Sequence, residues 1–452
     1  MTRNRWGFGL GTLGRDMVAA LVSMYLLFYL TDVLDVSGAQ LAVVTVILVV
    51  MRIFDAVNDP FMGVIVDNTH TRWGKFKPWI FWGGLLWGIA TLMIFFDTGV
   101  DGWNYVILFT VLYLVWEIAF TINDIAYWSM LPSLTRDQKE RERIGVVARI
   151  CANVGLFSIA VGLVPLTRWL TDVFGSERTA WFVLAVALVV IMLAFQSLNL
   201  ILTRERVTTR PEATPLRELF SVIFRNDQLM WVTLAMVAYM AGYITTTSFG
   251  LYYFKYIFDD EGAYPIFAAV LGVTQIAALA LFPLVSRVLK RRQIHLLATV
   301  LCLAGYVVFL FSGTSLPLVA VAGVLLFSGQ GAIQLLMVMF IADSVEYGEW
   351  KLGRRNESIT FSLQPFIYKL SNAIASGVVG ATVIISGIDE ATSAADVSVS
   401  GATTVRLSML VLPMILMTVS YLILRARYTL DEEFYARVVR EVKERHVLQA
   451  AD

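Results

Sequence analysis

Long apolar segments alternate with short polar ones along the whole chain. About 20 consecutive apolar residues form a helix that spans the hydrocarbon layer of a membrane, and the sequence contains twelve such segments. The pattern therefore predicts an all-α membrane protein with twelve transmembrane helices. The predicted spans cover residues 8–33, 41–66, 79–96, 105–131, 144–170, 180–202, 228–257, 266–289, 296–311, 318–343, 361–388 and 404–424.

A hydrophilic stretch near the middle of the chain, residues 203–227, contains two prolines and five arginines. It predicts a cytoplasmic loop between an N-terminal half of six spans, residues 1–202, and a C-terminal half of six spans, residues 228–426. This plan resembles that of the major facilitator transporters, whose substrate site lies between two repeated halves near the bilayer midplane. The remaining residues, 427–452, predict a cytoplasmic tail with an amphipathic helix over 430–448.

The basic residues are distributed unevenly over the loops. If the N-terminus is cytoplasmic, the segments on that side hold 27 of the 35 Lys and Arg residues. Cytoplasmic loops of membrane proteins carry an excess of positive charge. The asymmetry predicts a multi-pass protein of the cell (inner) membrane with both termini in the cytoplasm. The outside loops hold four basic residues, which are Arg168, Arg178, Lys255 and Arg406.

Composition narrows the class of protein further. Hydrophobic residues make up 58% of the 452 residues and charged residues 15%, with a mean hydropathy of +0.71. Soluble proteins carry about 25% charged residues, so a soluble enzyme with a single anchor is excluded. The formal net charge is zero, which argues against a nucleic-acid partner, because phosphate recognition needs a basic surface. Cys151 and Cys302 lie in apolar runs and predict neither a disulfide nor a cysteine-rich metal site.

Several ionisable residues fall inside the predicted spans. Such residues are costly in a membrane, and each indicates a functional site or an internal ion pair. The acids and the bases nearly balance. The basic residues are Arg15, Arg52, Arg149 and Lys369, and the acidic residues are Asp16, Asp55, Asp59, Glu117 and Asp124.

Four of the polar residues share one face of the second predicted span. Arg52, Asp55, Asn58 and Asp59 are spaced three and four residues apart, as neighbours along one side of a helix are. Two carboxylates one turn apart in a low dielectric share a proton or bind a cation between them. The alternative is that Arg52 only neutralises Asp55, which leaves Asn58 and Asp59 without a role. The spacing therefore predicts a cation site.

The fourth predicted span combines a carboxylate with aromatic rings. Asp124 and Trp128 lie one helical turn apart. A carboxylate that accepts hydrogen bonds from vicinal hydroxyls, beside an indole that covers the apolar face of a ring, is typical of a sugar site. The alternative is that Trp116 and Trp128 are ordinary interface or packing aromatics. The same face carries Glu117, Phe120, Thr121 and Tyr127, and Asp16, Arg149 and Lys369 from other spans could complete a polar centre.

Five runs of the sequence are distinctive: GLGTLGRD (9–16), YLLFYLTDV (25–33), RIFDAVNDPFMGVIVDNTHTRWGKFKPW (52–79), NDIAYWSMLPSLTRDQKERERI (123–144) and EYGEWKLGRRNESITFSLQ (346–364). In these runs the chain resembles the glycoside-pentoside-hexuronide:cation symporters, the major facilitator branch that includes the melibiose permease. The resemblance spans nearly the whole chain, and two stretches within the third run, DAVNDP (55–60) and RWGKFKPW (72–79), are specific. It implies cation-coupled transport of a sugar.

The resemblance also implies roles for individual residues. The family's cation ligands correspond to Asp55, Asn58 and Asp59, with Thr121 as a further oxygen ligand. A family loop that braces adjacent helices on the cytoplasmic side implies a gating role for Gly63, Asp67 and Arg72. The implied sugar-binding residues are Asp16, Asp124, Trp128, Arg149 and Arg15, with Phe120 and Trp116 beside them and Lys369 and Gln364 on the eleventh span.

The chain departs from the melibiose branch at three positions in this region. Phe120 stands where that branch has a tyrosine, and Pro365 where it has a threonine. Glu117 adds a carboxylate where a small residue is usual. These departures predict a sugar pocket with altered specificity, so that melibiose is not the expected substrate.

The leading hypothesis is symport of a glycoside with Na+ by alternating access. Asn58 and Thr121 favour Na+ because they add neutral oxygens to the carboxylates, and H+ or Li+ remain alternatives. The alternative substrate is an anionic sugar, a hexuronide or a sulfo-sugar, bound by Arg149 and Lys369, whereas a lipid substrate is disfavoured by so polar a centre. The chain is expected to act as a monomer in the bilayer, without a cofactor or a nucleic-acid partner.

A membrane enzyme is the alternative from another class. Asp55 and Asp59 have the spacing of an aspartate-rich magnesium site, as in prenyltransferases, but no second aspartate-rich helix completes a metal pair. The sequence contains no HExxH or GxSxG motif, and its histidines, His70, His295 and His446, lie in or beside predicted cytoplasmic segments. The sequence therefore predicts a secondary active transporter and not an enzyme.

Overall fold

The computed structural model describes residues 2–205, 219–260, 263–388 and 394–451 of the chain. The side chains of Arg52 and Asp55 are outside this description. Every element assigned in the described ranges is a helix, so the predicted all-α fold is confirmed. Most of the predicted loop 203–227 lies outside the described residues, except for its two ends and a short helix, α7 (Leu219–Arg225).

Each predicted span of the N-terminal half corresponds to one long helix. The helices extend beyond the apolar segments because their polar ends continue past the hydrophobic core of a membrane. Their bounds are α1 (Thr2–Phe28), continued by a π-helical turn η1 (Tyr29–Val33), α2 (Gly38–Asp67), α3 (Lys77–Phe95), α4 (Gly102–Leu134), α5 (Gln138–Phe174) and α6 (Glu177–Leu202).

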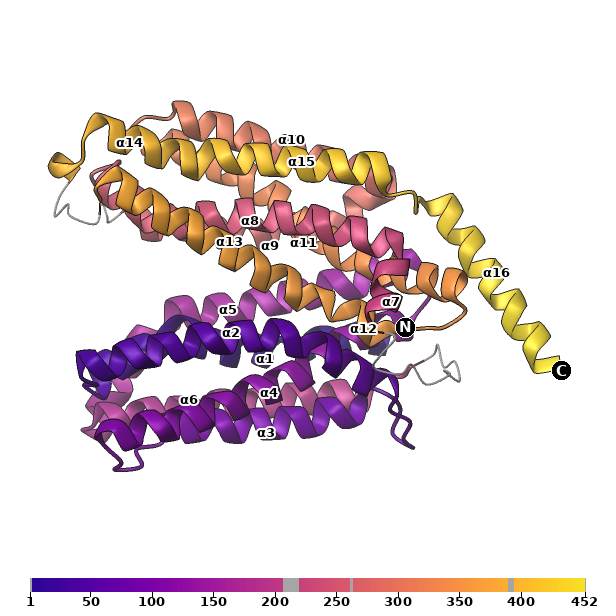
Figure 1. Ribbon diagram of the computed structural model, residues 1–452, viewed down its shortest axis with the longest axis horizontal. Helices are drawn as coiled ribbons and strands as arrows, with labels where there is room; N and C mark the ends of the chain where they lie inside the picture. Colours follow the sequence, from indigo (N-terminus) through magenta and orange to yellow (C-terminus); the bar gives the residue numbers. More distant parts are fainter. Residues whose placement is uncertain (1, 206–218, 261–262, 389–393, 452) are drawn as a thin grey trace. The chain divides into compact units, whose positions relative to one another are not determined.

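The C-terminal half follows the same plan with one helix divided by a π-helical turn. Its elements are α8 (Asp227–Tyr256), α9 (Ala263–Val288), α10 (Arg291–Phe311), α11 (Leu316–Leu352), α12 (Glu357–Phe361), α13 (Leu363–Ser386), a short 3-10 helix η3 (Ala394–Asp396), α14 (Val399–Arg406), η4 (Leu407–Val411) and α15 (Leu412–Arg427). The predicted tail helix is α16 (Glu432–Ala451), which leads away from the end of α15 (Figure 1).

Within the described residues, eleven helices are long and apolar enough to cross a membrane. The predicted span that is not among them is α2, where an apolar stretch, Ala39–Leu48, is followed by the charged positions of the predicted cation site. The prediction of a multi-pass membrane protein is confirmed. The count of twelve spans and the cytoplasmic position of both termini stay predictions.

Short capping sequences set the ends of the helices. The Asp137 carboxylate accepts the backbone N–H of Glu140 at 2.9 Å at the start of α5. The helix ends at Gly175, whose φ of 69° is accessible to glycine at little cost. The Ser176 hydroxyl then accepts the N–H of Thr179 to begin α6. These caps satisfy backbone groups that have no partner within a helix, so α5 and α6 are joined by a very short turn.

The chain forms two compact units. Unit 1 comprises Met1–Leu219 and the separate segment Arg354–Ser362, and unit 2 comprises Phe220–Gly353 and Leu363–Asp452. The separate segment contains α12, which packs against α2 and α4. Unit 1 therefore includes a short piece of chain that lies between α11 and α13 in the sequence.

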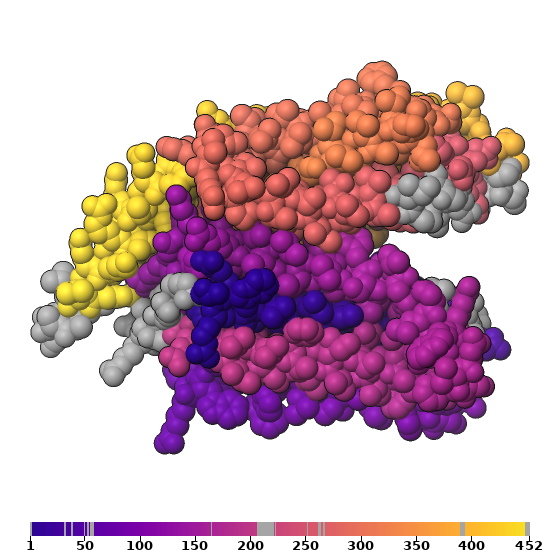
Figure 2. Space-filling view, turned by 180° about the vertical axis from the view of Figure 1, so that it is seen from behind, coloured from indigo at the N-terminus to yellow at the C-terminus, as the bar shows by residue number. Residues whose placement is uncertain are grey.

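In unit 1, α1 packs against both α5 and α6, while α4 packs against α2 and α3. The space-filling view shows the indigo N-terminal helix between the magenta segments of α5 and α6 (Figure 2). The Thr12 hydroxyl on α1 donates to the Ala148 carbonyl on α5 at 2.8 Å. Because α1 contacts two neighbours at once, Arg15 is buried within the unit and Asp16 is half-buried.

In unit 2, α11 is the most enclosed helix, with 72% of its apolar window buried. It packs against α8, α9 and α10, and its end contacts α16. The Trp350 indole N–H donates to Glu441 at 2.6 Å, and Arg445 donates to the Trp350 carbonyl at 3.2 Å. The apolar face of the tail helix, with Val438 and Val442 buried, is thus held against the rest of unit 2.

Candidate functional site

A polar centre lies inside unit 1, where α1 meets α4. Arg15 is 3% exposed. Its Nη2 donates to Asp124 Oδ1 at 2.6 Å, and its Nε donates to Asn123 Oδ1 at 2.8 Å. The guanidinium also lies over the ring of Tyr127, 4.2 Å from the centroid. Arg15 is therefore fixed by two charge-assisted hydrogen bonds and a cation–π contact.

Arg149 and Trp128 form the second part of this centre. The Arg149 guanidinium carbon lies 4.9 Å from the centroid of the Trp128 ring. The Arg149 Nε and Nη2 atoms are buried, and neither has a hydrogen-bond partner among the described residues. Asp16, which is half-buried, lies within electrostatic reach of Arg15, Arg149 and Asp124. The structure thus brings together five of the residues that the sequence predicts as sugar ligands.

This arrangement offers hydrogen-bonding groups that the described residues do not use. Arg15 holds Asp124 by its Oδ1 atom, and no described residue donates to Oδ2. Arg149 has two buried donor atoms without an acceptor in the same part of the chain. A buried polar group without a partner costs about 1–3 kcal/mol, so unused donors and acceptors in one place are suited to a ligand rich in hydroxyl groups.

Trp116 and Phe120 belong to an aromatic cluster. Their rings are stacked, with centroids 5.5 Å apart and an interplanar angle of 8°. The Trp116 indole N–H donates to the Thr91 hydroxyl at 3.0 Å, and Phe120 meets Trp87 edge to face at 5.2 Å. Trp116 is 5% exposed and packs as a core residue, whereas Phe120 is half-buried.

The predicted cation ligands lie where α2 meets α4 in unit 1. Asp59 is 1% and Thr121 2% exposed, and the Thr121 hydroxyl donates to Asp59 Oδ1 at 3.3 Å. Asn58 is half-buried, and the side chain of Asp55 is outside the described residues. Carboxylate, hydroxyl and amide oxygens are hard ligands that fit an alkali cation. The described residues contain no group of three His, Cys, Asp or Glu side chains that could hold a metal ion.

Lys369 and Gln364, the two predicted ligands on the eleventh span, lie on α13 in unit 2. Gln364 is 5% exposed, and Lys369 is half-buried.

Asp67, one of the predicted gating residues, is the last residue of α2. The Asp67 carboxylate accepts the backbone N–H groups of Ser358 and Ile359 at 3.0 and 2.9 Å. Lys75 Nζ lies 2.7 Å from Asp67 and 2.9 Å from Glu357. Burial lowers the pKa of Lys75, but the two carboxylates outweigh it and raise that pKa above its ordinary value. Asp67 therefore holds α12 inside unit 1 together with Lys75.

Two other predicted gating residues behave differently. Gly63 allows the close approach of α2 to α12, since a Cβ there would lie 2.8 Å from the Ser358 carbonyl oxygen. Arg72 is exposed in the connection between α2 and α3.

Glu205 was not predicted, although it lies beside the same cluster. Its carboxylate accepts the backbone N–H groups of Lys75 and Phe76 at 3.3 and 3.4 Å. Burial raises the pKa of Glu205, and the two N–H groups partly offset this shift. The sequence offered no signal for it, because an acid in a hydrophilic loop is ordinarily solvated.

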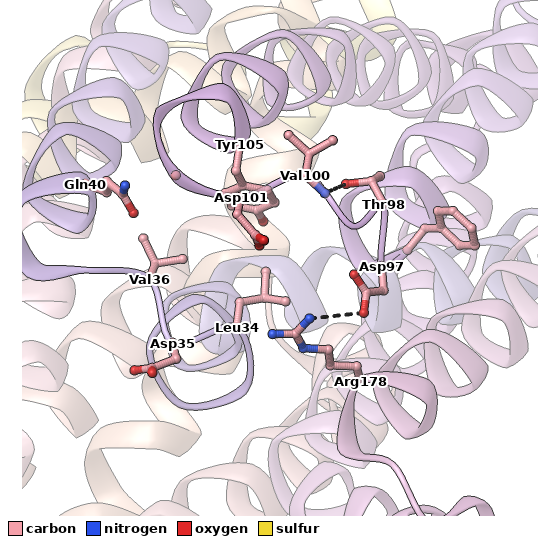
Figure 3. Close-up of a pocket in the computed structure, with 12 residues that line it drawn as sticks. Leu34, Asp35, Val36, Gln40, Asp97, Thr98, Val100, Asp101, Tyr105 and Arg178 are labelled. Carbon is pink, nitrogen blue, oxygen red and sulfur yellow. Dashed lines mark hydrogen bonds and ion pairs between the residues drawn. The ribbon is translucent and has the colours of Figure 1, made fainter.

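A separate pocket of about 260 Å³ lies at the opposite end of unit 1 (Figure 3). Arg178 donates to Asp97 at 3.1 Å at its edge. A hydrogen bond from the Gly99 N–H and the Arg178 charge hold the pKa of Asp97 below its ordinary value. None of the predicted site residues lines this pocket. Its lining comprises Leu34, Asp35, Val36, Gln40, Phe96, Asp97, Thr98, Val100, Asp101, Gly102, Tyr105 and Arg178.

Sequence reasoning also missed Asn123 and Gln196, which lie behind Arg15, and it placed Tyr127 on the face of Asp124 without giving it a role. The signal for Gln196 was present, because it is an uncharged amide within a mostly apolar predicted span. Tyr127 donates to the Phe8 carbonyl on α1. These residues pack behind the polar centre and not at its open side.

The chain is similar to known transporters over most of its length. Residues 7–432 match the family described as MFS/sugar transport protein. The raffinose carrier protein of Pediococcus pentosaceus is 31% identical over 96% of this chain and 70% of its own length. The glucuronide carrier protein homolog of Escherichia coli strain K12 is 30% identical over 82% of this chain and 81% of its own length.

A solved structure shares the fold. The crystal structure of FucP, a Major Facilitator Superfamily transporter in the outward conformation, covers 95% of this chain and 98% of its own, with a TM-score of 0.66 at 14% identity. The relatives and this neighbour are transporters, so the prediction of a transporter and not an enzyme is confirmed. The chain belongs to the MFS/sugar transport protein family, as a multi-pass membrane transporter of the glycoside-pentoside-hexuronide symporter type.

Proposed function

We propose that this protein imports a glycoside together with a cation, with Na+ as the first choice of ion. One observation carries the proposal. Inside the apolar helices of unit 1, Arg149 Nε and Nη2 have no hydrogen-bond partner among the described residues, and Arg15 engages only the Oδ1 atom of Asp124. The names of similar proteins, a raffinose carrier, lactose permeases and an isoprimeverose transporter, support a substrate with several sugar hydroxyls.

The sugar is bound by groups with complementary chemistry. Asp16 and the free oxygen of Asp124 accept hydrogen bonds from sugar hydroxyls, and Arg149 donates hydrogen bonds to them. Trp128, with Arg149 over its ring at 4.9 Å, presents an aromatic surface to the apolar C–H face of the sugar. Lys369 and Gln364 are proposed as the contribution of α13, and Phe120 with Trp116 as an aromatic wall.

The cation is bound by Asp55, Asn58, Asp59 and Thr121. Asp59 is almost fully buried, and an unneutralised carboxylate in that position is costly. A bound Na+ or a proton removes this cost. Na+ is favoured because the Thr121 hydroxyl contacts Asp59 and Asn58 is the preceding residue, so neutral oxygens are available beside the carboxylate.

The two sites are coupled through α4. Thr121 of the cation site and Asp124 of the sugar site lie three residues apart, on adjacent positions of one helix face. A cation that draws α2 toward Thr121 therefore also positions Asp124. Thermodynamic linkage requires that sugar and cation strengthen each other's binding by the same factor.

Gly63 and Asp67 are proposed to act in gating, with Lys75 as their partner. They hold α12, which the chain connects directly to α11 on one side and α13 on the other. Release of α12 from Asp67 and Lys75 would free this connection during alternating access. Arg72 is exposed and adds no contact that supports its part in the gate.

A second candidate substrate is an anionic sugar such as a hexuronide. The unpartnered Nε and Nη2 atoms of Arg149 favour it, because a guanidinium binds a carboxylate with two parallel hydrogen bonds. The 30% identity to a glucuronide carrier protein homolog points the same way. Asp16 in the same centre opposes it by charge repulsion, so the neutral glycoside remains the first choice.

The test is uptake into proteoliposomes of purified protein. Labelled raffinose, lactose and a glucuronide are offered with an inward Na+ gradient, an inward H+ gradient, or neither. At least one sugar should accumulate above its equilibrium level only when a cation gradient is present. Asp124→Asn should abolish this accumulation, and Asp97→Asn, which changes an exposed acid outside both sites, should leave it intact.

Each outcome decides a separate part of the proposal. Accumulation that ignores both Na+ and pH removes cation coupling. Preference for the glucuronide over the neutral sugars replaces the first substrate class by the second. No uptake of any sugar, with the protein correctly folded, overturns sugar transport.

A further inference from the structure

A chain of buried amides lies directly behind Arg15. Asn123 on α4 is fully buried, and Gln196 on α6 is 2% exposed. Asn123 Nδ2 donates to Gln196 Oε1 at 3.2 Å, and Gln196 Nε2 donates back to Asn123 Oδ1 at 3.3 Å. Asn123 Nδ2 also donates to the Ile80 carbonyl on α3 at 2.8 Å. The pair thus connects α3, α4, α6 and, through Arg15, α1.

The hydrogen bonds allow only one orientation of the Asn123 amide. Its oxygen must face the Arg15 Nε–H, which can only donate, and its nitrogen must face the Ile80 carbonyl, which can only accept. Gln196 fills the remaining donor and the remaining acceptor of Asn123. A rotated Asn123 amide would place its nitrogen against the Arg15 Nε–H, so Arg15 and Ile80 fix the orientation, and Gln196 stabilises the amide in that orientation with two further hydrogen bonds.

The position of Arg15 in turn decides which part of Asp124 is available. With Nε held by Asn123, Nη2 reaches Oδ1 of Asp124 at 2.6 Å. The Asp124 side chain is 18% exposed, while that of Arg15 is 4% exposed. Arg15 therefore binds Asp124 Oδ1 from the buried side of the carboxylate, and Asp124 Oδ2 is left for the more exposed side of the polar centre.

We propose that Gln196 and Asn123 are positioning residues for sugar recognition, which act through Arg15 to present one oxygen of Asp124 to the substrate. The inference rests on the proposed function. It assigns control of sugar affinity to a residue on α6, which itself does not reach the polar centre.

A glycine on α3 supports the importance of this arrangement. A Cβ at Gly84 would lie 2.2 Å from Gln196 Oε1 and 3.2 Å from Asn123 Nδ2. No side chain therefore fits at Gly84 while the amide pair is in place. Gly84→Ala offers a way to displace Gln196 without removing any polar group.

The experiment measures binding of raffinose, lactose and a glucuronide to the purified full chain in Na+. The variants are Gln196→Met, which keeps the shape and removes the hydrogen bonds, and Gly84→Ala. Each should weaken sugar binding by about 10-fold, as expected for loss of a hydrogen bond that supports a charged group. In transport assays KM should rise while the maximal rate changes little, and Na+ binding without sugar should be unchanged.

The matched control is Asn199→Leu, which changes another buried amide on α6. The Asn199 side-chain atoms have no hydrogen-bond partner among the described residues, and Asn199 has no contact with Arg15 or Asp124 in the hydrogen-bond chain. This variant should bind sugar like the wild type. Equal weakening by Asn199→Leu would mean that any change on α6 disturbs the bundle, which overturns the specific role of Gln196.

A double-mutant cycle separates positioning from a merely structural effect. If Gln196 acts through Arg15, the double variant Gln196→Met with Arg15→Ala should bind sugar no more weakly than Arg15→Ala alone. Additive losses would overturn the proposal. Failure of the wild type to bind any of the three sugars removes the proposed function, and this inference with it. Sugar binding by the wild type and equally by Gln196→Met overturns the inference alone.

Discussion

At the residue scale, the burial of charge explains why a few side chains are candidates for the functional site. Arg15 and Asp59 are 3% and 1% exposed inside unit 1. Arg15 donates hydrogen bonds to Asp124 and Asn123, and the carboxylate of Asp59 accepts a hydrogen bond from the Thr121 hydroxyl. Each of these charged groups therefore has a partner on another helix, and a change at either position is expected to alter the contact between two helices.

Replacement of Asp59 by cysteine should separate active transport from passive exchange. Asp59→Cys removes the carboxylate that binds the cation, so a gradient of Na+ can no longer drive accumulation of sugar. Downhill exchange of sugar should persist, because the sugar ligands are unchanged. Proteoliposome uptake with and without a Na+ gradient measures both activities. Asp172→Cys, at an exposed position near the end of α5, is the control, and full accumulation by Asp59→Cys would refute the cation site.

At the element scale, short contacts between backbones fix how the helices pack. Asp67 at the end of α2 accepts two backbone N–H groups of α12, and α12 approaches so closely that only glycine fits at position 63. Burying an ion pair gives little net stability, but removing one partner is strongly destabilising. The Asp67, Lys75 and Glu357 cluster therefore works as a unit.

Gly63→Ala should weaken the contact between α2 and α12. The added methyl group would lie 2.8 Å from the Ser358 carbonyl oxygen and 3.1 Å from the Ile359 Cα, so the backbones must separate. The expected loss of stability is about 1–3 kcal/mol, as for other overpacked sites, with slower transport. The melting temperature in detergent and the transport rate are the measurements. At Gly377 on α13 a Cβ meets nothing within 4 Å, so Gly377→Ala should be neutral, and equal effects of the two substitutions would contradict the contact.

At the scale of the whole molecule, two helical units share one chain, and each has its own chemistry. The polar centre and the cation ligands with described side chains all lie in unit 1, while Lys369 and Gln364 lie in unit 2. The charge distribution over the loops predicts that both ends of the chain face the cytoplasm.

Reporter fusions test this topology. A fluorescent protein that matures only in the cytoplasm should be bright when fused after residue 451 and dark when inserted at Gly99 or Gly313, in the turns after α3 and α10. Alkaline phosphatase, active only outside, should give the opposite result. A dark C-terminal fusion in a stably inserted protein would contradict the cytoplasmic C-terminus.

Much of this protein could be predicted from its sequence. The apolar segments determined the helices, because a membrane-spanning backbone must satisfy its hydrogen bonds within each segment. Among the charged residues within those segments, Asp16, Asp59, Asp124 and Arg149 were predicted as site residues, because a charge in a membrane interior is costly and indicates a function or an ion pair.

Only the tertiary structure decided how those residues are used. The rotation of each helix about its own axis decides which oxygen of Asp124 contacts Arg15 and which neighbours hold Arg15 in place. The same rotation places Trp116 in a core stack and Trp128 against Arg149. That rotation is set by contacts between helices distant in sequence, such as Gln196 with Asn123 and Asp67 with Ser358. Periodicity reports which residues share a face, and packing alone determines what that face contacts.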